Sequence, residues 1–153
     1  MRIILLMKYY AYENFRDDTI SLISQIKEFE PQIIIAIARG GLIPAHSIAE
    51  GLGLREVQSL RTELYDDTKK RDSISVFNNC KLSEGTKRVL VVDDIADSGD
   101  TLKAVMDDLR SKHLGVKFKS ATLFYKKTSV HKPDFWINEA TEWIEFFWEK
   151  DFL

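Results

Sequence analysis

The chain has 153 residues, 44% of them hydrophobic and 30% charged, with a formal net charge of −2 and a single cysteine, Cys80. This length and composition predict one folded domain that needs no disulfides and suits a reducing cytoplasm. The near-neutral charge and the lack of an N-terminal signal or a membrane-spanning run argue against nucleic acid and membrane as partners.

The first part of the chain predicts a helix followed by a buried strand. Both Met1 and Met7 are compatible with a natural start, and in the second case residues 1–6 form a tail. A helical spacing of apolar side chains predicts a helix over residues 15–29. The uninterrupted apolar run over residues 33–38 is typical of a parallel strand that is buried on both faces.

Helical and extended patterns alternate along the rest of the chain. Residues 65–75 predict a mobile polar loop. The other elements are expected as helices over residues 44–52 and 101–112, and as strands over residues 57–64, 74–77, 88–92 and 117–125. This alternation predicts an α/β fold in one domain over residues 1–153, with a mostly parallel central sheet flanked by helices.

The segment after the strand at 88–92 carries the groups that indicate a function. Asp93, Asp94 and Asp97 follow the end of this strand, and ligands of open α/β sheets bind beyond the carboxyl ends of strands. The turn over residues 98–101 leads into a helix, whose N-terminal amides favour an anion. Acceptors for sugar hydroxyls or a hydrated cation therefore lie about one sugar away from a phosphate site.

Two other interpretations of this segment stay open. An acidic pair can simply end a strand, with Ser98 or Asp100 capping the next helix. Receiver domains also carry acidic residues after an early strand, but here the pair lies more than halfway along the chain, before a hydroxyl-glycine turn.

Residues 89–101 closely resemble the signature of the type I phosphoribosyltransferases: four apolar residues, two acids, then an Asp-Thr/Ser-Gly-x-Thr loop. The resemblance implies that family's single-domain fold, with a small hood from the C-terminal region, and phosphoribosyl pyrophosphate as the donor. In the family the acidic pair, matched by Asp93 and Asp94, engages the ribose hydroxyls and Mg²⁺, with Asp94 as the metal-side residue. Asp97 matches the general acid/base at purine N7. The residues that match the 5′-phosphate loop are Asp97, Ser98, Gly99, Asp100 and Thr101, with the Asp100 carboxylate expected to point to solvent.

Arg39, Gly40 and Gly41 end the first buried strand. Alone, they indicate a plain turn more often than a site. Glycines let backbone amides approach an anion closely, however, and an arginine can form paired hydrogen bonds with phosphate oxygens. Beside the acidic motif they resemble the family's pyrophosphate loop. Relatives often have a strained or cis peptide bond there, so we expect one between Ala38 and Arg39.

The loop over residues 65–75 is a second candidate for contact with pyrophosphate. A charge run is most often a solvated connection, but in the family the loop at this place closes over the pyrophosphate. The cations that would neutralise the leaving group are Lys69, Lys70 and Arg71.

The C-terminal part of the chain resembles the base-binding hood of the bacterial xanthine-guanine phosphoribosyltransferases, here over residues 127–153. Lys126 follows the expected strand at 117–125, and Trp143 and Ile144 begin a Trp-Ile-Glu segment like theirs. Those enzymes place such a lysine on the purine 6-oxygen and stack such a tryptophan on the base. An ammonium and an indole face suit a flat 6-oxo heterocycle. The alternative is a surface lysine and core aromatic side chains.

The function implied by these resemblances is Mg²⁺-dependent transfer of 5-phosphoribosyl to guanine, xanthine or hypoxanthine in purine salvage. The transition state would have oxocarbenium character, with Mg²⁺ and Arg39 stabilising the departing pyrophosphate. The family also implies a homodimer or homotetramer. Two alternatives remain: a regulator that binds phosphoribosyl pyrophosphate, and a transferase with another acceptor.

Overall fold

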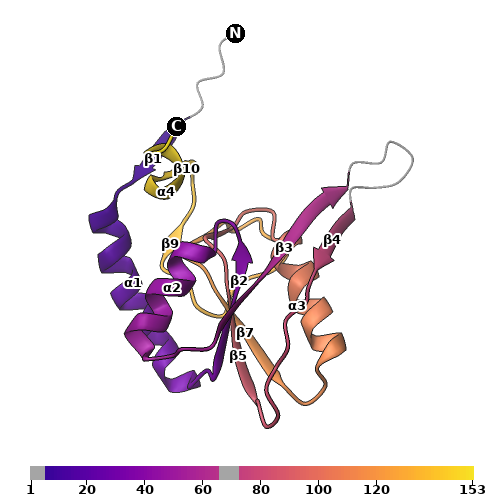
Figure 1. Ribbon diagram of the computed structural model, residues 1–153. Helices are drawn as coiled ribbons and strands as arrows, with labels where there is room; N and C mark the ends of the chain where they lie inside the picture. Colours follow the sequence, from indigo (N-terminus) through magenta and orange to yellow (C-terminus); the bar gives the residue numbers. More distant parts are fainter. Residues whose placement is uncertain (1–5, 66–72) are drawn as a thin grey trace.

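A five-stranded sheet forms the centre of the computed structural model, which describes residues 6–65 and 73–153 (Figure 1). Its strand order is β4-β3-β2-β5-β7. The strands are β2 (Ile33–Ala38), β3 (Val57–Tyr65), β4 (Ser73–Phe77), β5 (Arg88–Val92) and β7 (Lys117–Ala121). All pairings are parallel except that of β4 with β3. The predicted α/β fold with a mostly parallel sheet is therefore confirmed.

Helices cover both faces of this sheet (Figure 1). Helices α1 (Tyr12–Ile26) and α2 (Leu42–Leu52) pack on one face and α3 (Asp100–Lys112) on the other, and the short 3₁₀ turn η1 (Lys27–Phe29) extends α1. Within residues 6–65 and 73–153, no helix is long and apolar enough to cross a membrane.

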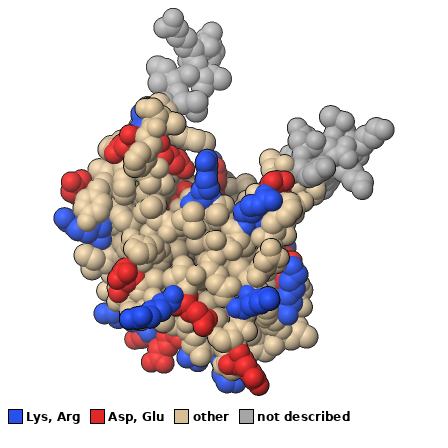
Figure 2. Space-filling model, in the orientation of Figure 1, with Lys and Arg blue, Asp and Glu red and all other residues tan. Residues whose placement is uncertain are grey.

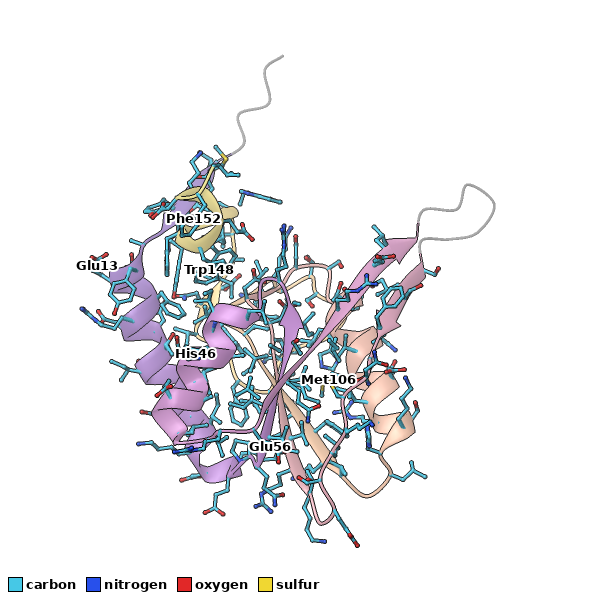
Figure 3. The ribbon with its side chains drawn as sticks, viewed as in Figure 1. Glu13, His46, Glu56, Met106, Trp148 and Phe152 are labelled. Atoms are coloured by element: carbon cyan, nitrogen blue, oxygen red, sulfur yellow. The ribbon has the colours of Figure 1, made fainter. Side chains whose placement is uncertain are left out.

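Strand β2 contributes side chains to both layers of the core. Ile34 and Ala36 belong to the cluster under α1 and α2, whereas Ile33, Ile35 and Ile37 belong to the cluster that contains Met106 of α3 (Figure 3). Successive side chains of a strand point to opposite faces, so a strand covered on both faces needs an unbroken apolar run. This is the physical reason for the sequence of β2.

The strand expected over residues 117–125 was wrong in its second half, because β7 ends at Ala121. The amides of Leu123 and Phe124 both donate to the carbonyl of Asp94, at 3.0 and 3.2 Å, and this turns the chain out of the central sheet. Strand β8 (Phe124–Tyr125) then lies between β6 (Ile95–Ala96) and β9 (Asn138–Glu139) in a separate three-stranded sheet.

The two ends of the chain lie side by side in a hood above the central sheet (Figure 1). Strand β1 (Met7–Tyr10), which was not predicted, pairs in parallel with β10 (Trp143–Phe146), and α4 (Phe147–Lys150) follows. Leu6, which one interpretation assigned to a terminal tail, accepts a hydrogen bond on its carbonyl from the amide of Trp143 at 3.1 Å. Trp148 fills the space between the hood and α1, stacked on Phe146 (Figure 3).

Strands β3 and β4 include both ends of the loop predicted over residues 65–75. Tyr65 ends β3, and residues 73–75 begin β4, where antiparallel pairing with β3 satisfies their backbone. Lys69, Lys70 and Arg71 lie outside the described residues, so their expected contact with pyrophosphate stays a prediction.

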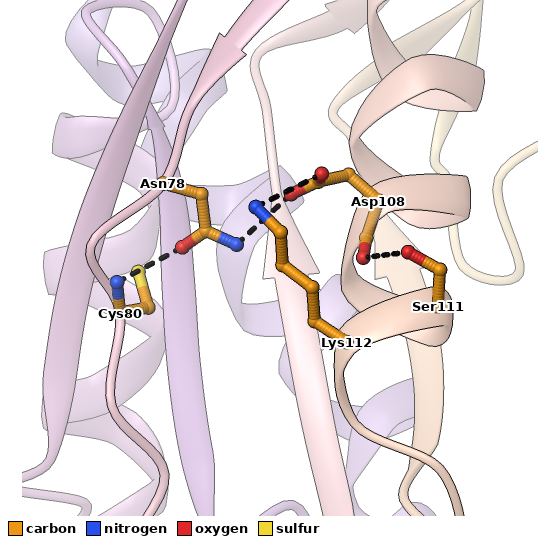
Figure 4. A network of polar contacts seen from close by, with 5 residues as sticks. All are labelled: Asn78, Cys80, Asp108, Ser111 and Lys112. Atoms are coloured by element: carbon orange, nitrogen blue, oxygen red, sulfur yellow. Dashed lines mark hydrogen bonds and ion pairs between the residues drawn. The ribbon is translucent and has the colours of Figure 1, made fainter.

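Cys80 belongs to a polar network that attaches the segment after β4 to α3 (Figure 4). Asn78 accepts a hydrogen bond from the Cys80 amide at 2.9 Å and donates one to the Asp108 carboxylate at 3.1 Å. Lys112 pairs with the same carboxylate at 3.1 Å. Burial raises the pKa of the Cys80 thiol, which disfavours the nucleophilic thiolate. The cysteine therefore has a structural place in the fold.

Candidate active site

The sequence motifs meet at the carboxyl ends of β2 and β5. These strands are neighbours, with Ala36 opposite Val92, so the turn after one lies against the turn after the other. A Cβ atom on Gly40 would lie 2.3 Å from the Asp94 carboxylate, and one on Gly41 would lie 2.3 Å from the Val92 carbonyl oxygen. At Gly41 the obstacle is backbone, so only glycine fits there, and at Gly40 any side chain would displace the Asp94 carboxylate. The Ala38–Arg39 peptide bond is cis, as expected.

Asp93 and Asp94 place two carboxyl groups side by side at this edge. Asp94 is 8% exposed and accepts the Ile95 amide at 2.8 Å, and its own amide donates to Asp93 at 2.8 Å. Burial raises the pKa of Asp94 from 3.8 to about 6, and the negative charge of Glu149 adds to this. The pKa of Asp93 is also raised, by loss of solvation and by the Asp94 charge.

Within the part of the chain that the structure describes, the charged forms of this acidic pair have no cationic partner. Among the residues described, no lysine or arginine forms an ion pair with either carboxylate. Lysine and arginine side chains are interspersed with acidic ones on the face shown in Figure 2, and neither sign forms one large patch. A bound cation or a set of hydroxyl donors would therefore compensate the pair locally.

The loop after the acidic pair forms a small cavity at the N-terminus of α3. Gly99 has a φ of 83° and precedes the first helical residue, Asp100, whose amide donates to the Ser98 hydroxyl at 3.2 Å. The Asp100 side chain is exposed, as expected. The cavity has a volume of about 190 Å³, and its lining is Asp93, Asp94, Ile95, Ala96, Asp97, Ser98, Gly99, Thr101 and Leu102. The backbone amides in the first turn of a helix and the positive end of its dipole favour an anion at such a position.

Strand pairing brings Asp97 and Lys126 together. Each follows a short parallel strand, and the preceding residues, Ala96 and Tyr125, are register partners in the pairing of β6 with β8. The Lys126 ammonium lies 3.4 Å from the Asp97 carboxylate, and both side chains are about half exposed. A carboxylate and an ammonium group therefore face the same open space.

That space is a larger cavity of about 480 Å³ under the hood. Its lining is Leu6, Asp94, Ile95, Asp97, Lys126, Ala140, Thr141, Glu142, Trp143, Ile144, Phe146 and Glu149. The Trp143 side chain is 61% exposed, whereas Ile144 is buried. Asp94, Ile95 and Asp97 line both cavities, so the two spaces adjoin.

Some lining residues were not recognised in the sequence. Leu6 and Glu149 reach the larger cavity because β1 and β10 pair across almost the whole length of the chain. No local pattern indicates such a pairing. Glu142, in contrast, directly precedes Trp143, and this adjacency could have marked it as a candidate.

Comparisons with known proteins agree with this geometry. A family model described as a phosphoribosyl transferase domain matches residues 8–151. The chain is 32% identical over 118 residues to a xanthine-guanine phosphoribosyltransferase of Idiomarina loihiensis, covering 76% of this chain and 70% of that protein. It resembles the solved structure of the Helicobacter pylori xanthine-guanine-hypoxanthine phosphoribosyltransferase, with 36% identity, a TM-score of 0.89 and 96% of both chains covered. A purine phosphoribosyltransferase from Pyrococcus horikoshii matches with 29% identity, a TM-score of 0.81 and 93% of both chains covered.

Proposed function

Because the chain belongs to the phosphoribosyltransferase family, we propose that it transfers 5-phosphoribosyl from phosphoribosyl pyrophosphate to a 6-oxopurine in cytoplasmic purine salvage. The acceptor is guanine, xanthine or hypoxanthine, the purines named in its relatives. The observation that carries the proposal is the pair of adjoining cavities, one at a helix N-terminus and one beside a lysine and an exposed indole. A nucleoside monophosphate needs these two environments about one sugar apart.

The donor would occupy the smaller cavity and the edge beside it. The loop over residues 97–101 and the α3 amides would hold the 5′-phosphate. Asp93 and Asp94 would accept hydrogen bonds from the ribose hydroxyls. Arg39 and the Gly40 amide would bind pyrophosphate, since Gly40 packs directly against Asp94. Gly41 would shape the turn, because its amide donates to the Ile37 carbonyl at 2.8 Å.

Mg²⁺ suits the donor side of this site. Within the described part of the chain, no three His, Cys, Asp or Glu side chains form a metal-binding group. Mg²⁺ commonly uses one or two protein carboxylates together with substrate phosphates, and Asp94, beside Asp93, fits that role. When bound, the ion supplies positive charge for the developing pyrophosphate.

The acceptor would lie in the larger cavity. Lys126 would donate to the 6-oxygen, and Trp143 would stack on the purine, with Ile144 forming the cavity wall. As the bond from ribose C1′ to pyrophosphate breaks and the bond from C1′ to purine N9 forms, the N7 proton passes to Asp97. The products are a nucleoside monophosphate, pyrophosphate and this proton.

Product formation across a panel of nucleobases, with donor and Mg²⁺, tests the proposal. Turnover of guanine, xanthine or hypoxanthine is expected, and turnover of only a non-purine acceptor would contradict the purine assignment. Light scattering on the purified protein tests the proposed homodimer or homotetramer.

Variants separate the roles within the larger cavity. Lys126→Ala should raise the purine KM by roughly 10- to 100-fold with little change in donor KM, because it removes a charged hydrogen bond to the base alone. Lys127→Ala is the matched control, since Lys127 is exposed and pairs with Glu139 outside the cavity. Trp143→Ala should raise the purine KM by roughly two- to tenfold. Asp97→Asn should lower kcat by about 10²-fold or more, with donor binding retained.

A further inference from the structure

The segment over residues 126–131, which we call the brace segment, is attached to the 5′-phosphate loop at two points. The Lys126 amide donates to the Ala96 carbonyl at 3.0 Å, and the Val130 amide donates to the Ser98 carbonyl at 2.8 Å. One end of the brace segment therefore carries the base-reading lysine, and the other end holds the backbone of the loop that binds phosphate.

Ser129 maintains the shape of the brace segment. Its amide donates to the Lys126 carbonyl at 2.8 Å, and its hydroxyl donates to the His131 carbonyl at 2.8 Å. The His131 amide in turn donates to this hydroxyl at 3.3 Å. The Ser129 backbone amide thus closes the turn over residues 126–129, and its hydroxyl closes the turn over residues 129–131.

Ser129 also packs against the tightest point of the phosphate loop. A Cβ atom on Gly99 would lie 2.1 Å from the Ser129 hydroxyl oxygen and 2.7 Å from the His131 amide nitrogen. Gly99 is buried and has a positive φ, so only a glycine lets the loop lie this close to the brace segment. Close-packed contacts of this kind transmit small displacements.

We propose that Ser129 is a positioning residue that holds the Lys126 ammonium and the 5′-phosphate loop at the spacing of one nucleotide. It is not among the described residues that line either cavity, so it acts through its neighbours and not by contact with substrate. This role rests on the proposed function. Its consequence is that one hydroxyl affects recognition of the base and of the donor together.

Steady-state kinetics on Ser129→Ala tests this role. The substitution removes both hydrogen bonds of the hydroxyl. It keeps the backbone hydrogen bonds of the brace segment and introduces no clash with Gly99. We expect the KM of guanine and the KM of phosphoribosyl pyrophosphate each to rise by roughly three- to tenfold. Thr128→Ala is the matched control, because Thr128 is an exposed neighbour in the same turn, and both of its KM values should equal those of the wild type.

A second background separates positioning from a general loss of folded enzyme. In Lys126→Ala, adding Ser129→Ala should still raise the donor KM but should leave the purine KM unchanged, because the lysine through which Ser129 acts is gone. Faster amide hydrogen exchange over residues 98–101 in Ser129→Ala would support the same role without any turnover.

Two results would overturn the assignment. One is a Ser129→Ala enzyme with reduced kcat and both KM values unchanged, and the other is an equal rise in purine KM with and without Lys126. If the wild type turns over no purine while exchange over residues 98–101 still depends on Ser129, the proposed function is wrong. The structural role of Ser129 in holding this loop is then still supported.

Discussion

At the scale of single residues, Asp93 and Asp94 have raised pKa values, yet their proposed role requires the charged carboxylates. Their burial beside one another raises the pKa of both carboxyl groups, so the folded protein holds the charged forms less readily than water does. The proposed donor and Mg²⁺ nevertheless require those charged forms. The free protein therefore carries a destabilised acidic pair that ligands would compensate.

The first prediction concerns the stability that Asp94 costs. The pKa of Asp94 in the folded protein, about 6, is above its ordinary value of 3.8. The folded protein therefore favours the protonated carboxyl group. The stability that this group contributes is fully present below pH 3.8 and is lost as pH rises through about 6. Asp94→Asn should therefore gain stability relative to the wild type between pH 4 and pH 7, by on the order of 3 kcal/mol. Urea unfolding without donor or Mg²⁺ measures this.

Asp107→Asn is the control for that experiment. Lys103 lowers the pKa of Asp107 through a hydrogen bond at the protein surface, so any change in stability should be small and of opposite sign. A difference between Asp94→Asn and the wild type that stays constant from pH 4 to pH 7 would contradict the predicted burial effect. In the presence of Mg²⁺, Asp94→Asn should also bind the donor more weakly, which calorimetry measures.

At the scale of elements, one carboxylate joins two consecutive N-terminal elements to a strand near the other end of the chain. Asp18 on α1 accepts hydrogen bonds from the Tyr10 hydroxyl of β1 and from the Asn138 amide of β9, the latter at 2.8 Å. Strand β1 supports β10, which carries Trp143. The position of the hood over the central sheet therefore depends on a polar contact that lies away from both cavities.

The second prediction is that Asp18→Ala destabilises the fold by about 1–3 kcal/mol, because it leaves the Tyr10 hydroxyl without its acceptor and leaves the Asn138 amide only the Leu123 carbonyl at 3.3 Å. Asp17→Ala is the matched control, since Asp17 is an exposed neighbour that forms a surface ion pair with Arg16. Urea unfolding compares the two variants. Equal free energies of unfolding would show that Asp18 does not anchor the hood.

At the scale of the whole molecule, local patterns predicted most of the fold and of the candidate site. Residues 89–101 carry a strand, an acidic edge and a helix start within one short stretch, so their relation needs no distant contact. Met7–Tyr10 could not be predicted as a strand, because three of its four residues are exposed and it forms only by pairing with the other end of the chain. Leu6 and Glu149 were missed for the same reason.

The break after Ala121 shows another limit of local patterns. Leu123, Phe124 and Tyr125 are buried, as a continued strand would require, yet Phe124 and Tyr125 belong to a different sheet. The decisive interaction is a pair of hydrogen bonds, in which the backbone carbonyl of Asp94 accepts the amides of Leu123 and Phe124. This contact also sets β8 beside β6, and thereby brings Lys126 to Asp97.

The last prediction follows from the way the two cavities adjoin. The larger cavity brings both ends of the chain together with Asp94, Ile95, Asp97 and Lys126, and the smaller cavity is formed by residues from the segment 93–102. A guanosine monophosphate molecule should therefore bind both parts at once and stabilise the whole fold. At about 100 times its Kd, such a ligand adds about 2.7 kcal/mol, which corresponds to a rise in Tm of roughly 5–10 °C for a chain of this size. Thermal unfolding followed by fluorescence measures the shift.

Guanosine is the matched control, because it keeps the base and the sugar but lacks the phosphate that the α3 amides would hold. At the same concentration it should raise Tm by clearly less than the nucleotide does. Equal shifts would mean that the loop over residues 97–101 does not bind the 5′-phosphate, and the assignment of the smaller cavity would then be wrong.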